Sequence, residues 1–231
     1  MDSLAQATMW TRQSPQENTL SLDPPYGQLK ITGKHVTKED GTIVQLRGMS
    51  LAWSINTTNW SENWFTPFWK SVTVAFVKCS WNSNVIRAPM GIMFGGYLEN
   101  PETEYEKVKT IIDAAIDMGI YVIVDWHDER AYYENHTVAA IQFFSNISQT
   151  YGNYSNIIYE IFNEPVNATW AQIKSYAVRV ITAIRQNDQK NIIVVGTPNW
   201  STDVDVAAED PINGTNIAYT LHIYAGRDYS F

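Results

Sequence analysis

A carboxylate at the edge of an apolar segment is the first feature of the sequence that could do chemistry. Glu164 stands near the end of residues 158–165, where every position but three is apolar. Partial desolvation is expected to raise the pKa of its carboxyl group, which suits a general acid working near neutral pH. A glutamate at a helix N-terminus, favoured by the helix dipole, is the alternative interpretation. Glu160 is the competing carboxylate, but we expect it to face a structural partner inside the fold.

Three basic side chains could act together with such a carboxylate. Arg87 cannot be neutralised and would hold a neighbouring carboxylate ionised, although an ordinary ion pair would use the same residue. His127 and His222 each follow a predicted strand, and two histidines at matching positions favour a functional site over unrelated structural histidines. Neither a His-x-x-x-His pattern nor a carboxylate facial pattern accompanies them, and no glycine-rich nucleotide motif follows a strand. We therefore expect no metal ion and no cofactor.

Aromatic residues are abundant, with nine Trp and thirteen Tyr. Trp53, Trp60, Trp64 and Trp200 fall in predicted loops, where an exposed indole could stack on the face of a sugar. Some of them could instead cover the core. This aromatic content favours a flat, uncharged ligand, such as a neutral polysaccharide.

Short apolar segments must position these side chains. Five of them are continuous and rich in β-branched residues, which is typical of parallel strands covered on both faces. They span residues 84–87, 121–125, 157–161, 192–196 and 217–221. Nearer the N-terminus, residues 29–32 and 43–47 are predicted to be strands joined by a hairpin at Asp40-Gly41.

Amphipathic segments separate the predicted strands. Asn100 and Pro101 mark the start of one helix and Gly119 marks its end. Residues 138–150 and 169–187 are predicted to be helices as well, whereas residues 70–78 are unusually β-branched for a helix. Such repeated units belong either to a (β/α)8 TIM barrel or to a doubly wound sheet, both of the α/β class.

The distribution of polar residues decides between these two folds. The candidate site residues fall at or just past the carboxyl ends of successive predicted strands, which form one rim in a parallel barrel. A doubly wound sheet would concentrate them at its switch point. The even spread favours a barrel, with strand ends that carry Arg87, Asp125–Trp126–His127, Asn163–Glu164, Trp200 and His222.

Charge excludes some classes of partner. Asp and Glu number 24 against 16 Lys and Arg, which gives a net charge of -8. Nucleic acids and anionic membranes need clustered positive charge, so we expect neither as a partner. No stretch of eighteen apolar residues is present. Cys79 is the only cysteine and is expected to be a buried, inert thiol.

The chain divides into two parts. Residues 1–26 are polar, end in Pro24-Pro25 and are expected to be a disordered leader, while residues 27–231 form the barrel domain. No secretory signal is visible in the leader. Eight Asn-X-Ser/Thr sequons nevertheless suggest a secreted, extracellular protein.

Six motifs in order along residues 27–226 resemble glycoside hydrolase family 5, the cellulase family, near its endo-β-1,4-glucanases. They are residues 47–54 (RGMSLAWS), 85–91 (VIRAPMG), 122–127 (VIVDWH), 158–165 (IYEIFNEP), 193–201 (IVVGTPNWS) and 221–226 (LHIYAG). Pro89 stands where an alanine is more usual in the family.

The resemblance implies a (β/α)8 barrel that hydrolyses β-glucans with retention of configuration, using two glutamates. It implies that Glu164 is the acid/base and that Asn163 binds the sugar 2-hydroxyl. The resemblance also gives roles to Arg87 (stabilising the nucleophile), to His127, His222 and Tyr224 (hydrogen bonding in the active site) and to Trp200 (an aromatic platform). Trp53 is a further candidate for substrate binding.

The resemblance also implies that the chain covers about six of eight barrel strands. The family nucleophile, a glutamate after the seventh strand, would lie beyond Phe231. Asp228 is the only acidic residue after Leu221, and nothing places it opposite Glu164. The 231 residues alone are therefore expected to be inactive and poorly stable. The expected function is a retaining endo-β-1,4-glucanase; the alternatives are a non-catalytic β-glucan-binding barrel and a mannanase or mixed-linkage glucanase.

Overall fold

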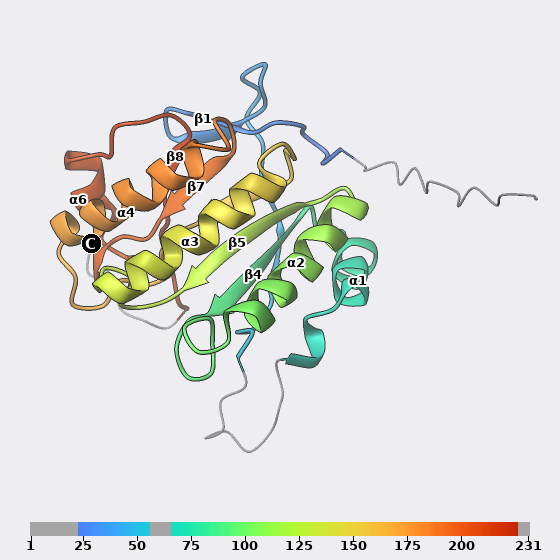
Figure 1. Ribbon diagram of the computed structural model, residues 1–231. Coiled ribbons are helices and arrows are strands. Elements are labelled where there is room, and N and C mark those ends of the chain that lie inside the picture. Colours follow the sequence, from blue (N-terminus) through green and yellow to red (C-terminus); the bar gives the residue numbers. More distant parts are fainter. Residues whose placement is uncertain (1–22, 56–65, 226–231) are drawn as a thin grey trace, which may run out of the picture.

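The computed structural model describes residues 23–55 and 66–225, which form a curved parallel sheet with helices on its outer side (Figure 1). Each strand of this sheet pairs with the next strand along the chain, and every pairing is parallel. This order confirms the barrel arrangement, since a doubly wound sheet reverses its order at a switch point. The six strands are β3 (Gly48–Ser50), β4 (Val85–Gly91), β5 (Tyr121–His127), β6 (Ile157–Glu160), β7 (Ile192–Val195) and β8 (Ile217–Tyr219).

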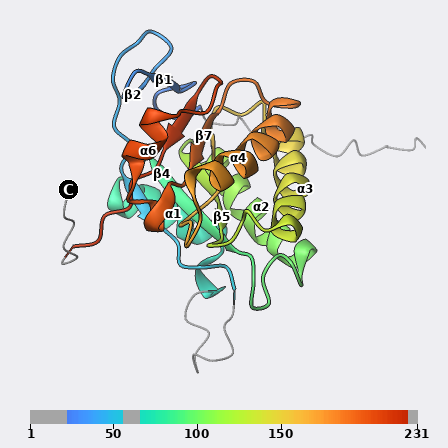
Figure 2. The same cartoon turned by 90° about the vertical axis from the view of Figure 1, so that its left-hand side faces the viewer.

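The helices follow the strands in alternation and surround them on the outside (Figure 2). A 3-10 turn, η1 (Thr66–Phe68), precedes the first helix. The α-helices are α1 (Ser71–Trp81), α2 (Pro101–Asp117), α3 (Glu134–Tyr151), α4 (Trp170–Arg185), α5 (Pro198–Ser201) and α6 (Val204–Glu209).

Local signals account for the start of α4 and the end of α2. A capping box formed by Thr169 and Gln172 begins α4. Gly119, with φ of 61°, follows the end of α2 in the left-handed region that favours glycine. Asn100 precedes α2 as predicted, but its side chain does not cap the helix. It donates instead to the carbonyl of Gly95 at 2.9 Å.

Both faces of the sheet are covered by apolar side chains, which explains why the strands do not alternate. On the outer face, Ile86 of β4 belongs to the large core shared with helix residues such as Ile112. On the inner face, Val85 and Tyr121 form a second, smaller cluster with Leu29. Strands β4, β5, β6 and β7 are therefore buried from two sides, as their continuous β-branched sequences predict.

The N-terminal hairpin differs from the prediction. Its strands are β1 (Lys30–Thr32) and β2 (His35–Thr37), which pair antiparallel across Gly33. The Asp40-Gly41 turn exists, but it joins β2 to a single bridge between Thr37 and Ile43. Residues 43–47 are otherwise not a strand, and the first strand of the parallel sheet is β3 instead. The prediction was wrong because the apolar residues Val44 and Leu46 pack under the sheet without entering its ladder.

Two further expectations need correction, the position of Arg87 at the end of its strand and the burial of Cys79. β4 continues to Gly91 and β5 to His127, so Arg87 lies inside its strand and not at its end. Cys79 is exposed, because the buried face of α1 is carried by Val74 and Val77 and a residue two positions further points away from it.

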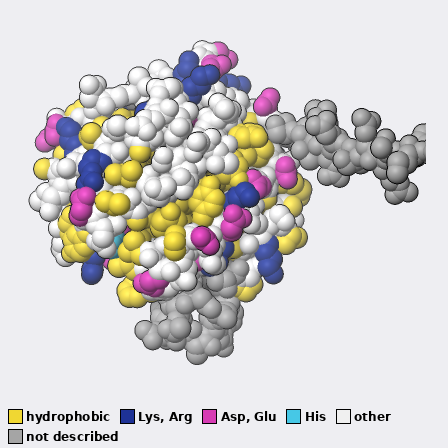
Figure 3. All heavy atoms as spheres, in the orientation of Figure 1, with side chains coloured by type: hydrophobic (Ala, Val, Ile, Leu, Met, Phe, Trp, Pro, Cys, Tyr) yellow, Lys and Arg dark blue, Asp and Glu magenta, His cyan; other side chains and the backbone are white. Residues whose placement is uncertain are grey.

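The structure describes only some residues of the predicted leader and loops. Tyr26 stacks on Tyr121 with ring centroids 6.4 Å apart, so the described structure begins before residue 27. Residues 1–22, Trp60, Trp64 and Asp228 lie outside the described residues. Within the described ranges, none of the helices has the length and apolar character needed to cross a membrane. On the face shown in Figure 3, Lys and Arg side chains are interspersed with Asp and Glu and form no basic patch.

Candidate active site

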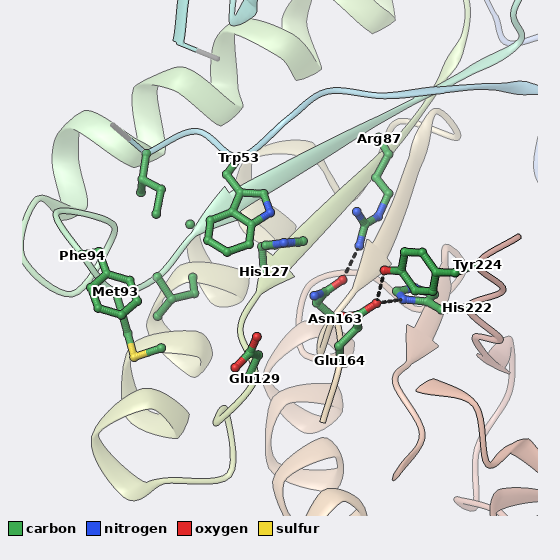
Figure 4. Close-up of a pocket in the computed structure, with 13 residues that line it drawn as sticks. Trp53, Arg87, Met93, Phe94, His127, Glu129, Asn163, Glu164, His222 and Tyr224 are labelled. Carbon is green, nitrogen blue, oxygen red and sulfur yellow. Dashed lines mark hydrogen bonds and ion pairs between the residues drawn. The ribbon is translucent and has the colours of Figure 1, made fainter. Parts of the chain in front are cut away.

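A cavity of ≈ 230 Å³ opens at the carboxyl ends of the parallel strands (Figure 4). Residues from the loops after β3, β4, β5, β6 and β8 contribute to it, together with Arg87 and Gly91 of β4 and His127 of β5. Its lining consists of Trp53, Ile55, Arg87, Gly91, Ile92, Met93, Phe94, His127, Glu129, Asn163, Glu164, His222 and Tyr224.

Arg87 is the centre of a polar network on the inner face of the sheet. Its Nε and Nη2 donate to the two carboxylate oxygens of Glu160 at 2.7 and 3.1 Å. Nη2 also lies 2.8 Å from a carboxylate oxygen of Asp125 and donates to Oδ1 of Asn163 at 2.8 Å. Burial lowers the pKa of Arg87, but the two carboxylates outweigh it and raise the pKa above its usual value. Glu160 therefore has the structural partner that the sequence predicted.

The same network orients Asn163 toward the cavity. Its side-chain oxygen accepts from Arg87, so the amide nitrogen is left to donate to a ligand. The residue is 5% exposed and lines the cavity. A fixed amide donor of this kind suits recognition of a hydroxyl group.

His127 and Trp53 form one wall of the cavity. The imidazole Nδ1 of His127 is 2.7 Å from Oδ2 of the buried Asp125, which fixes the ring. The indole of Trp53 lies against it, with ring centroids 4.8 Å apart. Next to Trp53, the Ser54 hydroxyl accepts from the Gly91 amide at 2.9 Å and donates to the buried carboxylate of Glu104. These contacts hold the Trp53 loop against the end of β4.

Glu164 lies on the opposite wall between two donors. Its Oε1 is 2.7 Å from Nδ1 of His222 and accepts from the Tyr224 hydroxyl at 2.5 Å (Figure 4). The other ring nitrogen of His222 faces Glu160 at 3.7 Å. Burial lowers the pKa of His222, but the nearby carboxylates of Glu160 and Glu164 outweigh it and raise the pKa to about 9. His222 is therefore protonated at neutral pH.

The expected pKa of Glu164 has the wrong sign. Burial does raise it, as the apolar segment suggested, but the hydrogen bonds from His222 and Tyr224 lower the pKa below its ordinary value. These donors come from 58 and 60 residues further along the chain. The carboxyl group is thus ionised at neutral pH in this structure.

Close backbone packing sets the position of the segment that carries Glu164. Its amide donates to the carbonyl of Asp128 at 3.4 Å, and the Ser201 hydroxyl donates to the carbonyl of Asn163 at 2.7 Å. Gly196 lets the chain after β7 approach this segment, because a Cβ there would lie 2.3 Å from the carbonyl oxygen of Phe162. Neighbouring strand ends therefore hold the carboxylate from both sides.

The structure brings together seven of the eight site residues predicted from the sequence. Trp200 is the exception, since it is not among the residues that line the cavity. It belongs to the short α5, with φ of 58°, and its amide donates to the carbonyl of Pro165 at 3.1 Å. Its side chain is 37% exposed.

The sequence analysis missed Glu129, Met93 and Phe94. Glu129 stands two residues past β5, where a strand-end rule could have found it. Met93 and Phe94 lie in a loop whose course no local pattern predicts. Within the described ranges, no group of three His, Cys, Asp or Glu side chains is placed to hold a metal ion.

The parallel β/α arrangement and the polar cavity at the carboxyl ends of its strands place this chain in the class of β/α-barrel enzymes, whose active sites lie at that end of the barrel. The chain belongs to the cellulase family, glycosyl hydrolase family 5, whose family model matches residues 37–231.

Curated relatives and solved structures agree with this assignment. The chain is 44% identical over 210 residues to an endoglucanase of Clostridium saccharobutylicum, covering 87% of this chain and 44% of the relative. It is 48% identical over 181 residues to endoglucanase Z of Dickeya dadantii, covering 78% of this chain and 41% of the relative. The chain thus spans less than half the length of these two relatives.

Among solved structures, the catalytic domain of Thermobifida fusca endoglucanase Cel5A superposes with a TM-score of 0.80 at 35% identity. The match covers 88% of this chain and 67% of that domain. A variant of the same domain has been solved in complex with cellotetraose.

Proposed function

We propose that the protein containing this chain is a retaining endo-β-1,4-glucanase that hydrolyses internal bonds of cellulose or related β-glucans. The observation that carries the proposal is the Glu164 carboxylate, which lines the cavity beside His222, Tyr224 and Asn163. The relatives named endoglucanase and the cellotetraose complex support it.

Glu164 is the proposed acid/base. In its protonated form it would donate a proton to the glycosidic oxygen of the leaving sugar, and as a carboxylate it would later take a proton from water. A retaining mechanism needs a second carboxylate about 5–5.5 Å away as the nucleophile. Such a group would also raise the pKa of Glu164 by repulsion of like charges, which offsets the lowering by His222 and Tyr224.

The resemblance to the family assigns this nucleophile to a glutamate after the seventh strand of the barrel, the strand that would pair with β8. The edge of β8, which pairs only with β7 within the described residues, is where such a strand would add. The Arg87 network would then lie on the floor of a complete barrel.

The remaining residues have binding roles in this proposal. Asn163 would donate its amide to a sugar hydroxyl, and His127 would offer its second ring nitrogen to another. Trp53, 42% exposed at the cavity wall, would stack on a sugar face. Trp200 would act on a sugar bound outside this cavity.

The test uses the full natural protein that contains these residues. Wild type is expected to lower the viscosity of hydroxyethylcellulose faster than it releases reducing ends, as an endo-acting enzyme does, and Glu164→Gln is expected to abolish most of this. Binding of the polymer without hydrolysis would favour a non-catalytic β-glucan-binding barrel. Faster hydrolysis of mannan than of cellulose would reassign the substrate.

We propose in addition that the protein is secreted. Its proposed substrate is a polymer too large to enter a cell, so the enzyme must meet it outside. The sequons at Asn135, Asn153 and Asn213 are exposed, which is compatible with this location. Detection of the protein in the medium of its natural host would test the proposal.

A further inference from the structure

The loop after β4 places an aromatic side chain at the cavity at some cost to the backbone. Phe94 is 67% exposed, lines the cavity and has φ of 56°. Bulky side chains rarely adopt this left-handed conformation, and such strain persists only where the surrounding structure enforces it.

Hydrogen bonds enforce the conformation on both sides of Phe94. The Gly96 amide donates to the Met93 carbonyl at 3.1 Å, and the Leu98 amide donates to the Ile92 carbonyl at 3.0 Å. The Asn100 side chain, which was expected to cap α2, donates to the Gly95 carbonyl instead. The loop is thus closed tightly around an exposed ring, which has no evident role in packing the core.

The loop after β5 places a carboxylate at the same cavity. Glu129 lines it, and in the view of Figure 4 its side chain lies between Phe94 and Glu164. Among the described residues, no hydrogen bond or ion pair joins the Glu129 carboxylate to a protein group. The two cationic groups at the cavity, Arg87 and His222, are instead engaged by other carboxylates.

The backbone around Glu129 is fixed although its carboxylate has no partner. Asp128 is buried and accepts from the Arg130 amide at 2.8 Å and from His136 at 2.7 Å. The carbonyl of Glu129 accepts from the Val166 amide at 3.2 Å, which ties the loop to the segment that carries Glu164. A rigid backbone therefore presents an unpaired acceptor to the cavity.

We propose that Phe94 and Glu129 form a sugar-binding position of this cavity that accepts neutral sugar units and disfavours units that carry carboxylates. This inference rests on the proposed glucanase function. The ring of Phe94 offers an apolar face to the sugar. The carboxylate of Glu129 is an acceptor only, with two oxygens for hydroxyl donors, and its negative charge repels a negative substituent.

The test compares a neutral and an anionic polymer with the full natural protein. The measured quantity is the ratio of kcat/KM on carboxymethylcellulose to that on hydroxyethylcellulose, at low salt. Glu129→Gln keeps the shape of the side chain and removes its charge, and we expect it to raise the ratio by about three- to tenfold. Glu129→Lys should raise it further, and 0.5 M salt should reduce these differences because it screens the charge.

A matched control separates the local effect from net charge. Glu209→Gln removes one exposed negative charge from α6, outside the cavity lining, and should leave the ratio unchanged. Phe94→Ala should raise KM for neutral cello-oligosaccharides while the rate on a short activated aryl glycoside changes little, because that substrate does not use the position.

The outcomes distinguish this inference from the proposed function. If wild type is active on hydroxyethylcellulose but Glu129→Gln and Glu209→Gln give the same ratio, the inference is wrong and the glucanase proposal stands. An equal loss of more than about a hundredfold on both polymers, with an unchanged melting temperature, would instead place Glu129 in the chemistry and overturn its role in selectivity. If wild type hydrolyses neither polymer, the proposed function itself fails.

Discussion

Nδ1 of His222 lies 2.7 Å from Oε1 of Glu164, although the two residues are 58 positions apart and follow different strands. Together with Glu160, this contact raises the pKa of the histidine above its ordinary value, and together with Tyr224 it lowers the pKa of the glutamate. It also means that the proton Glu164 needs as an acid is controlled by its neighbours and not by the apolar segment that carries it.

Replacing Glu164 with Gln in the full protein should lower kcat on cello-oligosaccharides by about 10²–10⁴-fold, the usual contribution of general acid–base catalysis. Binding of the oligosaccharide should persist, because the amide keeps the size of the side chain. Steady-state kinetics and calorimetric titration would measure the two effects. A loss below about tenfold would count against the assignment.

The His222 contact predicts a pH dependence of stability. The folded-state pKa of about 9 lies above the ordinary value of 6.5. The stabilisation is therefore complete below about pH 6.5 and is lost as the pH rises through about 9, because the folded state binds more protons than the unfolded state in that range. Urea unfolding between pH 6 and 10 should show this fall in wild type.

His222→Gln should remove most of this alkaline slope. His35→Gln, which changes an exposed histidine on β2 far from the cavity, should retain it. Glu160 and Glu164 affect stability at acid pH. Their pKa values are lowered in the folded state, so their stabilising contribution is lost as the pH falls through those values. A slope unaffected by His222→Gln would contradict the contact.

Arg87→Ala should be strongly destabilising. The change would leave Glu160 and Asp125 buried without their cation, and loss of one partner of a buried ion pair costs about 3–5 kcal/mol. Arg179→Ala is a suitable control, because its pair with Glu134 on the helix surface is exposed to solvent and contributes little to stability. Chemical denaturation of both variants would measure the difference, and equal effects would show that the network is not structural.

Trp53→Ala should affect substrate binding more than Trp200→Ala does. Trp53 lines the cavity and Trp200 does not, so KM for cello-oligosaccharides should rise by about tenfold or more in the first variant. Trp200→Ala should weaken only the binding of longer oligosaccharides and leave a short aryl glycoside unaffected. Equal losses for Trp200→Ala on short and long substrates would assign that residue to the fold.

Much of the fold could be predicted because its signals are local. The buried strands β5 and β7 are continuous β-branched segments, and Thr169 and Gly119 mark helix ends by their own chemistry. β3 was missed because three exposed residues at the edge of a sheet carry no such pattern. Its pairing depends on β4, which the sequence around Gly48 does not reveal.

The part of the candidate site that lies at strand ends could be predicted from the sequence. His127, Asn163 and His222 could be placed because they lie at or just past the ends of apolar strands. The sign of the Glu164 pKa could not, since it depends on hydrogen bonds between distant loops. Phe94 was missed for a related reason, because its orientation is set by the hydrogen bonds of its loop.

Glu164 is predicted to be the acid/base of a retaining mechanism, and azide rescue of a variant tests this role. Glu164→Ala in the full protein is given dinitrophenyl β-cellobioside, whose leaving group needs no proton, together with azide. Azide that attacks the covalent glycosyl-enzyme must yield the β-glycosyl azide, since two inversions retain configuration. Rate recovery by azide with the β-product, identified by proton NMR, is the predicted result. The α-glycosyl azide would make Glu164 the nucleophile, and no azide product would contradict the assignment altogether.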